Sequence, residues 1–316
     1  MVMIPERIRV TKHKISDAVI IGYGSIGKRH REILIDLGIN VAVLSSRKHD
    51  IDNSFTSYDE VEGFDPDYVI IASSTENHFS DLEKINQYCH PKAILVEKPI
   101  FSELPQEIKN TQDIKKYDSE IFVGYNLRFH PIISRLKDEL KGQKILSAHM
   151  YVGQYLPDWR PDRNHKETYS SIKEKGGGVL RDLSHELDLA QYLFGKNIDF
   201  KSIGGRFSDI TVDSDDVYCF VMSNEECKAI SMQMNYLDRV ARREAIINTE
   251  DNSYKYDLVN SVLEINGSNI EINSDRNISY INMHKAIIEE NHEGLCSIND
   301  GVEIMHIICE AEKDND

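Results

Sequence analysis

Apolar and polar positions alternate regularly along the first part of the chain. Short apolar runs of strand length are separated by stretches whose apolar positions repeat as in a helix. The runs are Ala18–Ile21, Asn40–Leu44, Tyr68–Ala72, Ala93–Val96 and Ile121–Gly124, and the helical stretches are Ser25–Leu37, Glu76–Tyr88 and Pro105–Lys116. Apolar strands that alternate with helices predict βαβ crossovers and a parallel sheet with helices on both faces.

The pattern changes after Gly124. Segment Phe200–Ile272 consists of short apolar stretches between turn residues, without an apolar period of helix length, which predicts an antiparallel or mixed sheet. We therefore expect two domains, residues 1–125 and residues 126–316, with the boundary near Gly124–Arg128. The other elements expected in the second domain are a strand at Ile145–Val152 and helices at Pro131–Leu140, Val179–Phe194, Ile278–Glu290 and Ile298–Ala311.

The composition is that of a globular protein without a nucleic-acid or membrane partner. Hydrophobic residues make up 40% of the chain, and the net charge of -16 argues against binding to a phosphate backbone. The cysteines are never spaced as CxxC, the histidines are dispersed, and no apolar run approaches a membrane span. Since the polar N-terminus also lacks a signal peptide's apolar core, we expect a cytoplasmic protein with reduced thiols and no metal site.

A glycine-rich turn follows the first predicted strand. Gly22, Gly24 and Gly27 match the pattern G-x-G-x-x-G, and Ser25 and Ile26 open the predicted helix. Such glycines permit a tight turn, close approach of the backbone to a pyrophosphate, and close packing of the helix on the strand. The free N–H groups of the helix N-terminus then face the phosphates. This context indicates a Rossmann dinucleotide-binding domain.

The end of the second predicted strand bears on the choice of cofactor. An acidic residue there would bind the ribose 2′-hydroxyl of NAD(H). The chain instead carries Ser46 and Arg47, and an Arg side chain is suited to binding a 2′-phosphate. The sequence therefore favours NADP(H). Asp50 and Asp52 nearby leave NAD(H) open, with Arg47 then lying in a solvated loop.

Polar residues also follow the later strands of the predicted parallel sheet, where ligands of such sheets bind. The expected cofactor contacts at these ends are Ser73, Thr75, His78, Glu97, Lys98 and Asn126. Lys98 lies directly after an apolar strand and before a proline, which places its ammonium group to hydrogen-bond a substrate hydroxyl beside the nicotinamide. The alternatives are that Ser73–His78 caps its helix and that Lys98 is an ordinary surface lysine.

A second group of candidates begins after three consecutive glycines, Gly176–Gly178. Asp182 and Asp188 each lie three residues from His185, so all three can be neighbours on the surface of one helix. A carboxylate beside an imidazole orients the ring and stabilises its charged form, which suits general acid–base catalysis. The alternative is a helix with an ordinary polar face.

The loop that precedes these glycines is rich in aromatic and basic residues. It holds Trp159, Arg160 and Arg163, and aromatic faces with Arg side chains are what sugar rings and anionic substituents require. Together with Arg128, Asp182 and His185, these residues are the candidates for binding a substrate. The loop is equally suited to a contact between subunits.

With these residues in view, the chain resembles the Gfo/Idh/MocA family of oxidoreductases. The resemblance rests on Gly22–Gly27, Asp65–Asp67 before an apolar strand, Glu97–Pro99, and Gly176–Gly178 followed by Asp182, His185 and Asp188. It implies a Rossmann domain followed by an α+β domain with a large open, mainly antiparallel sheet. It also implies homodimers or homotetramers formed through that sheet.

The resemblance implies a function as well as a fold. It makes the chain an NAD(P)-dependent oxidoreductase that transfers a hydride between the nicotinamide and a hydroxyl or keto group of a sugar, amino sugar or nucleotide sugar. Segments Gly124–Pro131, Gly153–Arg163 and Gly176–Asp188 are similar to a bacterial subgroup linked to surface-polysaccharide and nonulosonic-acid synthesis. A hydrolase that retains its NAD and a non-catalytic, nucleotide-sensing regulator are the alternatives.

The resemblance also implies roles for single residues. Lys98 is the catalytic or hydroxyl-binding lysine, His185 the proton acceptor and Asp182 the accompanying acid. One spacing departs from the family, which usually places four residues from Asp to His where this chain has three. Either the start of the helix is one residue shorter, or Arg181 occupies the position of the family's Asp.

Overall fold

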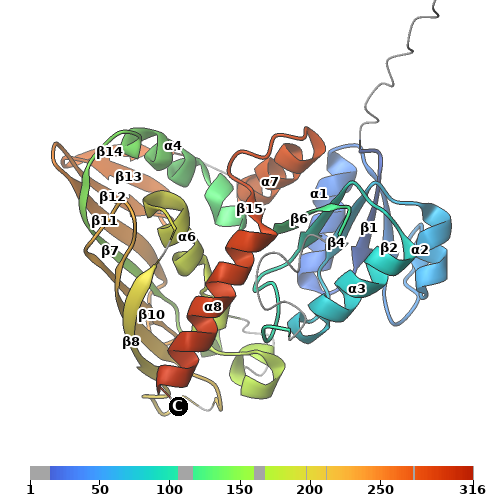
Figure 1. Ribbon diagram of the computed structural model, residues 1–316, viewed down its shortest axis with the longest axis horizontal. Helices are drawn as coiled ribbons and strands as arrows, with labels where there is room; N and C mark the ends of the chain where they lie inside the picture. Colours follow the sequence, from blue (N-terminus) through green and yellow to red (C-terminus); the bar gives the residue numbers. More distant parts are fainter. Residues whose placement is uncertain are drawn as a thin grey trace, which may run out of the picture.

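The computed structural model describes residues 15–105, 117–159, 168–196, 198–210, 212–272 and 275–315. A sheet lies in each half of the molecule, and helix α8 (Ile298–Asn315) runs between the two halves (Figure 1). Within the described residues, no helix is long and apolar enough to cross a membrane.

The first sheet has the strand order β15-β6-β5-β4-β1-β2-β3. Its strands are β1 (Asp17–Ile21), β2 (Asn40–Leu44), β3 (Ser54–Phe55), β4 (Tyr68–Ile71), β5 (Ala93–Val96), β6 (Glu120–Val123) and β15 (Cys296–Ser297). All neighbours are parallel except β15, which pairs antiparallel with β6. The parallel sheet expected from the sequence is confirmed, and β3 and β15 are additions that the pattern did not predict.

Helices cover both faces of this sheet because both faces of its strands are apolar. Ile20 and Ile70 belong to one core, together with residues of α1 (Ser25–Asp36) and α7 (Ile278–Ile288). Val19 and Val69 belong to the other, together with residues of α2 (Tyr58–Phe64) and α3 (His78–Tyr88). The predicted helix Pro105–Lys116 falls, from residue 106 onward, outside the described residues.

The second sheet has the strand order β14-β13-β12-β11-β7-β10-β9-β8. Its strands are β7 (Ile145–Gly153), β8 (Asp199–Gly205), β9 (Val217–Ser223), β10 (Ile230–Asn235), β11 (Arg242–Thr249), β12 (Ser253–Asp257), β13 (Val262–Ile265) and β14 (Ser268–Glu271). Strands β7 and β10 are parallel and the other pairs are antiparallel. The large, mainly antiparallel sheet is therefore confirmed.

Helices pack on one face of the second sheet. They are α4 (Pro131–Leu140), α5 (Val179–Asp182), α6 (His185–Phe194) and α8. Short 3₁₀ helices elsewhere in the described residues are Thr75–Asn77, Asn126–Phe129, Leu156–Asp158, Tyr169–Ser171 and Lys173–Lys175. The expectation of one continuous helix over Val179–Phe194 is wrong. Helix α5 ends when the N–H of Leu183 bonds to the carbonyl of Val179, and the chain turns at Ser184 before α6 begins.

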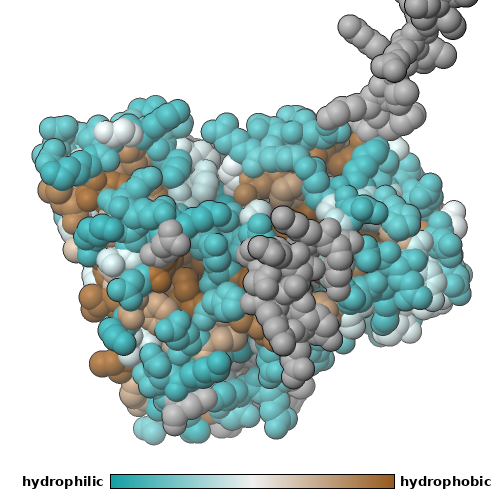
Figure 2. All heavy atoms as spheres, viewed as in Figure 1, coloured by the Kyte–Doolittle hydropathy of each residue, from teal (hydrophilic) through white to brown (hydrophobic). Residues whose placement is uncertain are grey.

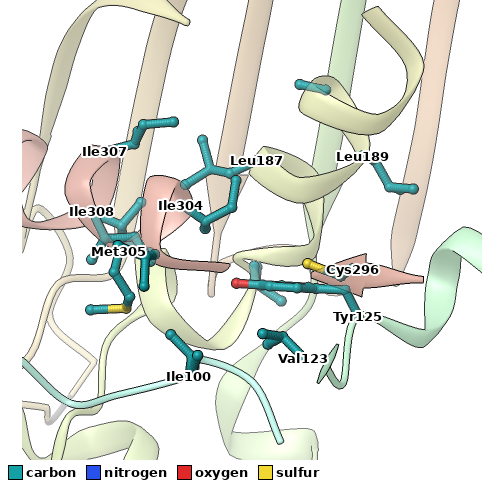
Figure 3. Close-up of a cluster of buried hydrophobic side chains, with 14 of the residues drawn as sticks. Ile100, Val123, Tyr125, Leu187, Leu189, Cys296, Ile304, Met305, Ile307 and Ile308 are labelled. Carbon is teal, nitrogen blue, oxygen red and sulfur yellow. The ribbon is translucent and has the colours of Figure 1, made fainter. Parts of the chain in front are cut away.

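A single apolar core joins the two halves. Figure 3 shows Val123 and Tyr125, from the end of β6, packed beside Leu187 of α6 and Met305 of α8. Strand β15 and helix α7, though late in the sequence, lie against the first sheet and α1. The division at residues 125 and 126 stays a prediction, and the structure adds that the chain returns to the first sheet near its end.

Candidate active site

The glycine-rich turn has a geometry that two of its glycines make possible. Gly22 has φ of +93°, and a Cβ there would lie 2.6 Å from the carbonyl oxygen of Ala72. A Cβ on Gly27 would lie 2.1 Å from the carbonyl oxygen of Gly22. At Gly24, in contrast, a Cβ would meet no atom within 4 Å. The outer glycines thus shape the turn, and Gly24 leaves open the space that a pyrophosphate needs.

A cleft of about 1000 Å³ opens above this turn, at the carboxyl ends of β1, β2, β4 and β5. Most of the predicted cofactor residues line it: Gly22, Gly24, Ser25, Ile26, Ser46, Arg47, Ser73, Thr75, His78, Glu97 and Lys98. Gly27 packs beneath the turn, and the buried Asn126 instead donates from Nδ2 to Ser279 Oγ at 2.6 Å. The volume, the turn and the helix N-terminus fit a dinucleotide.

The end of the cleft beside β2 is polar and basic. Ser45, Ser46 and Arg47 line it, and His49 Nε2 lies 3.1 Å from Ser45 Oγ. The His49 ring also meets Tyr23 edge-on, at 4.7 Å between ring centroids. Asp50 and Asp52 are outside the lining of the cleft. This end therefore presents hydroxyl and cationic groups to a ribose.

Sequence reasoning missed several residues that line the same cleft. Asp81 accepts hydrogen bonds from Tyr58 Oη at 2.7 Å and from Ser73 Oγ at 2.6 Å, which ties the starts of α2 and α3 to the end of β4. Burial, and then Asp81, raise the pKa of Tyr58 far above its usual value. Lys84 lies 5.2 Å from the centroid of the Tyr58 ring. Ser57 and Glu60 form a capping box that signals α2 in the sequence.

Lys98 connects the cleft to the second domain. Its Nζ donates to the backbone carbonyl of Asp182 at 2.6 Å, at the C-terminal end of α5. Burial lowers the pKa of Lys98, and so does the charge of Arg243, while Asp182 and Glu97 act in the opposite direction. The ammonium group is thus held at the junction of the two domains, beside the cleft.

The carboxylate of Asp182 bonds to a residue of the second domain that follows strand β10. Its Oδ2 accepts a hydrogen bond of 2.6 Å from Tyr236 Oη, just after β10. The ring of Tyr236 meets Trp159 edge-on, with centroids 5.2 Å apart. Trp159 therefore lies next to the predicted site, whereas Arg160 and Arg163 lie outside the described residues. Tyr236 carries no local signal that separates it from other strand tyrosines.

His185 begins helix α6 and is half-buried. Its ring meets the Tyr125 ring edge-on at 5.5 Å, and among the described residues its buried Nδ1 has no hydrogen-bond partner. Burial, followed by the charges of Lys98 and Arg243, lowers the pKa of His185 well below its usual value. The imidazole is therefore neutral near pH 7, which equips it to accept a proton. Asp182 ends α5 while His185 and Asp188 lie on α6, and Asp188 pairs with Arg128, so the predicted cluster of the three on one helix does not form.

Arg243 and Glu186 form a further charged pair near Lys98. Arg243 is the first inward-facing residue of β11, and its Nε lies 2.9 Å from Oε1 of the buried Glu186. Burial raises the pKa of Glu186, although the charge of Arg243 opposes this shift. Neither residue was expected from the sequence, because their contact joins segments distant along the chain.

Arg128, expected to bind substrate, is buried in an ion cluster. Its Nε and Nη2 donate to both carboxylate oxygens of Asp188 at 2.7–3.1 Å, and its Nη1 lies 3.5 Å from Asp300 Oδ2. The side chain is 4% exposed and the partner is 0% exposed. Since these carboxylates already bind the guanidinium group, the position of Arg128 favours a structural role at the junction of α6 and α8.

Within the described residues, no group of three or more His, Cys, Asp or Glu side chains is placed to hold a metal ion.

Comparison with known sequences agrees with the geometry of the cleft. Residues 17–125 match a family model described as an oxidoreductase family with an NAD-binding Rossmann fold. Myo-inositol 2-dehydrogenase of Thermotoga maritima is 27% identical over 192 residues, which are 57% of this chain and 55% of the relative. The rhizopine catabolism protein MocA of Rhizobium meliloti is 24% identical over 56% of each chain. The chain thus spans about half the length of the curated relatives it matches.

Solved structures share the fold over nearly the whole chain. Levoglucosan dehydrogenase in complex with NADH and L-sorbose superimposes with a TM-score of 0.80 at 16% identity, over 95% of this chain and 97% of that one. The UDP-N-acetylglucosamine 3-dehydrogenase GnnA of Acidithiobacillus ferrooxidans gives 0.75 at 18% identity, over 94% and 95%. A mutant of Gal80p from Saccharomyces cerevisiae gives 0.78 at 14% identity, over 95% and 96%.

Proposed function

We infer that this chain belongs, through its residues 17–125, to the Gfo/Idh/MocA family of NAD-binding oxidoreductases, and we propose that it transfers a hydride between NAD(P) and a sugar CH–OH group. One observation carries the proposal. The ammonium group of Lys98 lines the dinucleotide cleft at the end of β5, and the neutral imidazole of His185 lies close enough to Lys98 for that charge to lower its pKa.

Different residues of the cleft would bind different parts of the dinucleotide. The turn Gly22–Gly27 and the N-terminus of α1 would hold the pyrophosphate, and Ser46 and Arg47 the adenosine ribose. Ser73, Glu97 and Lys98, at the ends of β4 and β5, would lie on the nicotinamide side. When bound, the nicotinamide supplies the acceptor or donor of the hydride.

The chain's own groups would position the substrate and move its proton. Lys98 donates a hydrogen bond to the reacting hydroxyl oxygen, and His185 accepts the hydroxyl proton because its ring is neutral. Asp182 fixes Lys98 through its backbone carbonyl and is itself fixed by Tyr236. Trp159, packed on Tyr236, offers an aromatic wall to a sugar ring.

NADP(H) is the proposed cofactor form, with NAD(H) as the alternative. Arg47 and Ser46 line the cleft at the end of β2, whereas Asp50 and Asp52 do not. A guanidinium group binds a 2′-phosphate, and an acidic side chain would be needed to select the 2′-hydroxyl. Lys84, which lines the same cleft, adds a second cation.

A sugar, an amino sugar or a nucleotide sugar is the proposed substrate class. The support comes from relatives whose names specify inositol as substrate and from structural neighbours named for levoglucosan and for UDP-N-acetylglucosamine. Residues that would contact the sugar ring, including Trp159, would decide between these classes.

We also propose that the chain forms a homodimer or homotetramer through its second sheet. The face of this sheet opposite the helices carries exposed apolar side chains, and Figure 2 shows brown areas along that side of the molecule. Ile203 is 70% exposed, Val221 is 69% exposed and Ile246 is 43% exposed. Exposed apolar side chains on several strands of one sheet face are typical of a subunit interface.

The test follows nicotinamide absorbance with the enzyme at a concentration near that of the cofactor. NADP and NAD, oxidised and reduced, are combined with free and nucleotide-linked amino sugars, nonulosonic acids and inositols. We expect an absorbance change with at least one member, larger with NADP(H). Bound cofactor without any change across the panel would contradict the proposal and favour a hydrolase that retains its cofactor or a sensor.

Lys98→Met tests the assigned site within the same assay. The substitution keeps the length and apolar stem of the side chain and removes the charge. We expect most turnover to disappear while affinity for the cofactor stays nearly intact. An equal loss of both quantities would contradict the role of Lys98 toward the substrate hydroxyl.

A further inference from the structure

A chain of buried hydrogen bonds starts at the cleft and ends inside the first domain. Glu97 Oε1 lies 2.9 Å from His30 Nε2 on α1, and His30 Nδ1 lies 2.8 Å from His284 Nε2 on α7. His284 Nδ1 lies 3.0 Å from Tyr68 Oη on β4. His30, Tyr68 and His284 are completely buried, and Glu97 is 8% exposed. The catalytic roles proposed above involve neither His30 nor His284 nor Tyr68.

A donor and an acceptor can be assigned to each hydrogen bond that links Tyr68 to Glu97. Burial, and then the charge of Glu97, hold the pKa of Tyr68 well above its usual value, so its hydroxyl donates to His284 Nδ1. Burial depresses the pKa of His284 well below its usual value, which keeps the ring neutral with its proton on Nε2. That proton is donated to His30 Nδ1. His30 in turn carries its own proton on Nε2 and donates it to Glu97.

Glu97 at the end of this chain is a carboxylate. Burial alone would raise the pKa of Glu97, but the hydrogen bond from His30 and the charge of Lys98 outweigh burial and hold the pKa below its usual value. The backbone N–H of Lys98 donates to Oε2 at 3.2 Å. Gly124 leaves the room for this arrangement, since a Cβ there would lie 2.9 Å from Glu97 Oε1. The anion is thus fixed in place from several sides.

We propose that Tyr68, His284 and His30 hold Glu97 as a fixed anion at the nicotinamide end of the cleft, where it favours the oxidised cofactor over the reduced one. The inference rests on the cofactor site proposed above, and it adds an electrostatic role for Glu97 and a positioning role for the two histidines. The oxidised nicotinamide ring is positively charged and the reduced ring is neutral. A buried anion near the ring therefore stabilises the oxidised form selectively.

Calorimetric titration of the protein with oxidised and with reduced dinucleotide tests this role without turnover. Glu97→Gln removes the charge and keeps the shape, so we expect the ratio of the Kd for the oxidised form to the Kd for the reduced form to rise about tenfold. An unchanged ratio, with both forms still bound, would overturn this inference alone. Failure of the wild-type protein to bind either form would overturn the proposed function as well.

The histidine pair has its own test. His284→Phe leaves His30 Nδ1 without a donor, so we expect the same ratio to rise in the same direction, by less than in Glu97→Gln. Ile287→Val, also buried on α7, loosens the packing without touching these hydrogen bonds and should leave the ratio unchanged. A ratio that changes equally in both variants, or in neither, would overturn the positioning role.

Nitrogen NMR of the wild-type protein tests the chain even if the variants do not fold. We expect His284 to be neutral near pH 7 with its proton on Nε2, and His30 to carry its proton on Nε2 while its Nδ1 accepts from His284. An imidazolium ring at His284, or a proton on Nδ1 of His30, would overturn the assigned direction.

Discussion

At the scale of single residues, the charges around His185 decide what this imidazole can do. The dominant influences on its pKa are burial and the cations Lys98 and Arg243, and no carboxylate is among them. The ring is therefore a neutral acceptor in the free protein. Proton transfer from a substrate hydroxyl would place a positive charge beside Lys98 and Arg243, so Glu186, paired with Arg243, is positioned to moderate this cost.

This environment predicts the pH dependence of catalysis. His185 accepts a proton only while it is neutral, so activity is lost as the pH falls through its folded-state pKa, which lies well below 6.5. We expect the acidic limb of the kcat/KM profile to lie below pH 6.5 in the wild type. Arg243→Gln removes a neighbouring cation and should move this limb to higher pH.

Arg243→Lys is the matched control for that profile. It retains the positive charge, so its acidic limb should stay closer to that of the wild type than the limb of Arg243→Gln. If both variants kept the wild-type profile, the assignment of His185 as the group protonated in this limb would be wrong.

The site residues differ in how far the sequence could predict them. Lys98 and the glycines were found because a strand end or a turn gives them a local signature. Tyr236, Arg243 and Glu186 were missed because their contacts join segments far apart in the chain, and no spacing records that. Arg128 was predicted to bind substrate because it follows a strand of the parallel sheet, and ligands bind at the ends of such strands. In the structure it pairs instead with the buried Asp188.

At the scale of elements, the turn between β1 and α1 depends on Gly27 for its shape and on Gly24 for its openness. Gly27→Ala would place a methyl group 2.1 Å from the carbonyl oxygen of Gly22. We expect a loss of about 1–3 kcal/mol in the free energy of unfolding in urea, together with weaker cofactor binding. The strand and helix must separate to relieve this contact.

Gly24→Ala provides the control for this turn, since its Cβ meets no protein atom within 4 Å. The free energy of unfolding should change little, whereas cofactor affinity should fall because the methyl group enters the space for the pyrophosphate. Equal stability losses in the two variants would contradict the account of the turn.

The junction of the helices depends on the buried pair Arg128 and Asp188. Asp188→Asn removes the closer carboxylate partner of the buried guanidinium group and leaves Asp300, 3.5 Å from Nη1, so we expect a loss of about 3–5 kcal/mol in the free energy of unfolding. Glu250→Gln breaks the exposed pair with Lys144, whose side chains are 55% and 70% exposed, and should cost less than about 1 kcal/mol. Similar losses in urea denaturation would show that the buried pair is not essential.

Elements with a clear apolar pattern of their own were predicted well, and those defined by a few residues or by tertiary contacts were not. Strand β2 has the predicted bounds, and helix α4 has the predicted bounds as well. Strand β3 has two residues and α2 has seven, too few for an apolar period, although the capping box at Ser57 marked the start of α2. The break between α5 and α6 could not be predicted, because apolar residues continue through it and only tertiary contacts define it.

At the scale of the whole molecule, the alternation of strands and helices was enough to predict the two kinds of sheet. It was not enough to predict that the chain returns to the first sheet near its end. Strand β15 consists of Cys296 and Ser297, and its pairing with β6 has no signature in so short a segment. Cys296 of this strand belongs to the core that both halves share, and the hydrogen bond from Lys98 to the carbonyl of Asp182 also joins the two halves.

The exposed face of the second sheet predicts the behaviour of the protein in solution. Val221→Glu places a charge on the outward face of β9 and should convert an oligomer to monomers in analytical ultracentrifugation. Val240→Glu, at a position 71% exposed but outside the strands, should leave the oligomer intact. A monomeric wild type, or dissociation by both variants, would contradict an interface on this face.

The transfer of a labelled hydride tests the central claim most directly. Reduced cofactor carrying deuterium at nicotinamide C4 is incubated with the wild-type protein and a panel of keto sugars and nucleotide-linked keto sugars, and the products are analysed by mass spectrometry and NMR. We predict deuterium on a newly formed carbinol carbon with the wild type and very little with Lys98→Met. Bound cofactor that keeps its deuterium with every member of the panel would contradict the assignment of this chain as a sugar oxidoreductase.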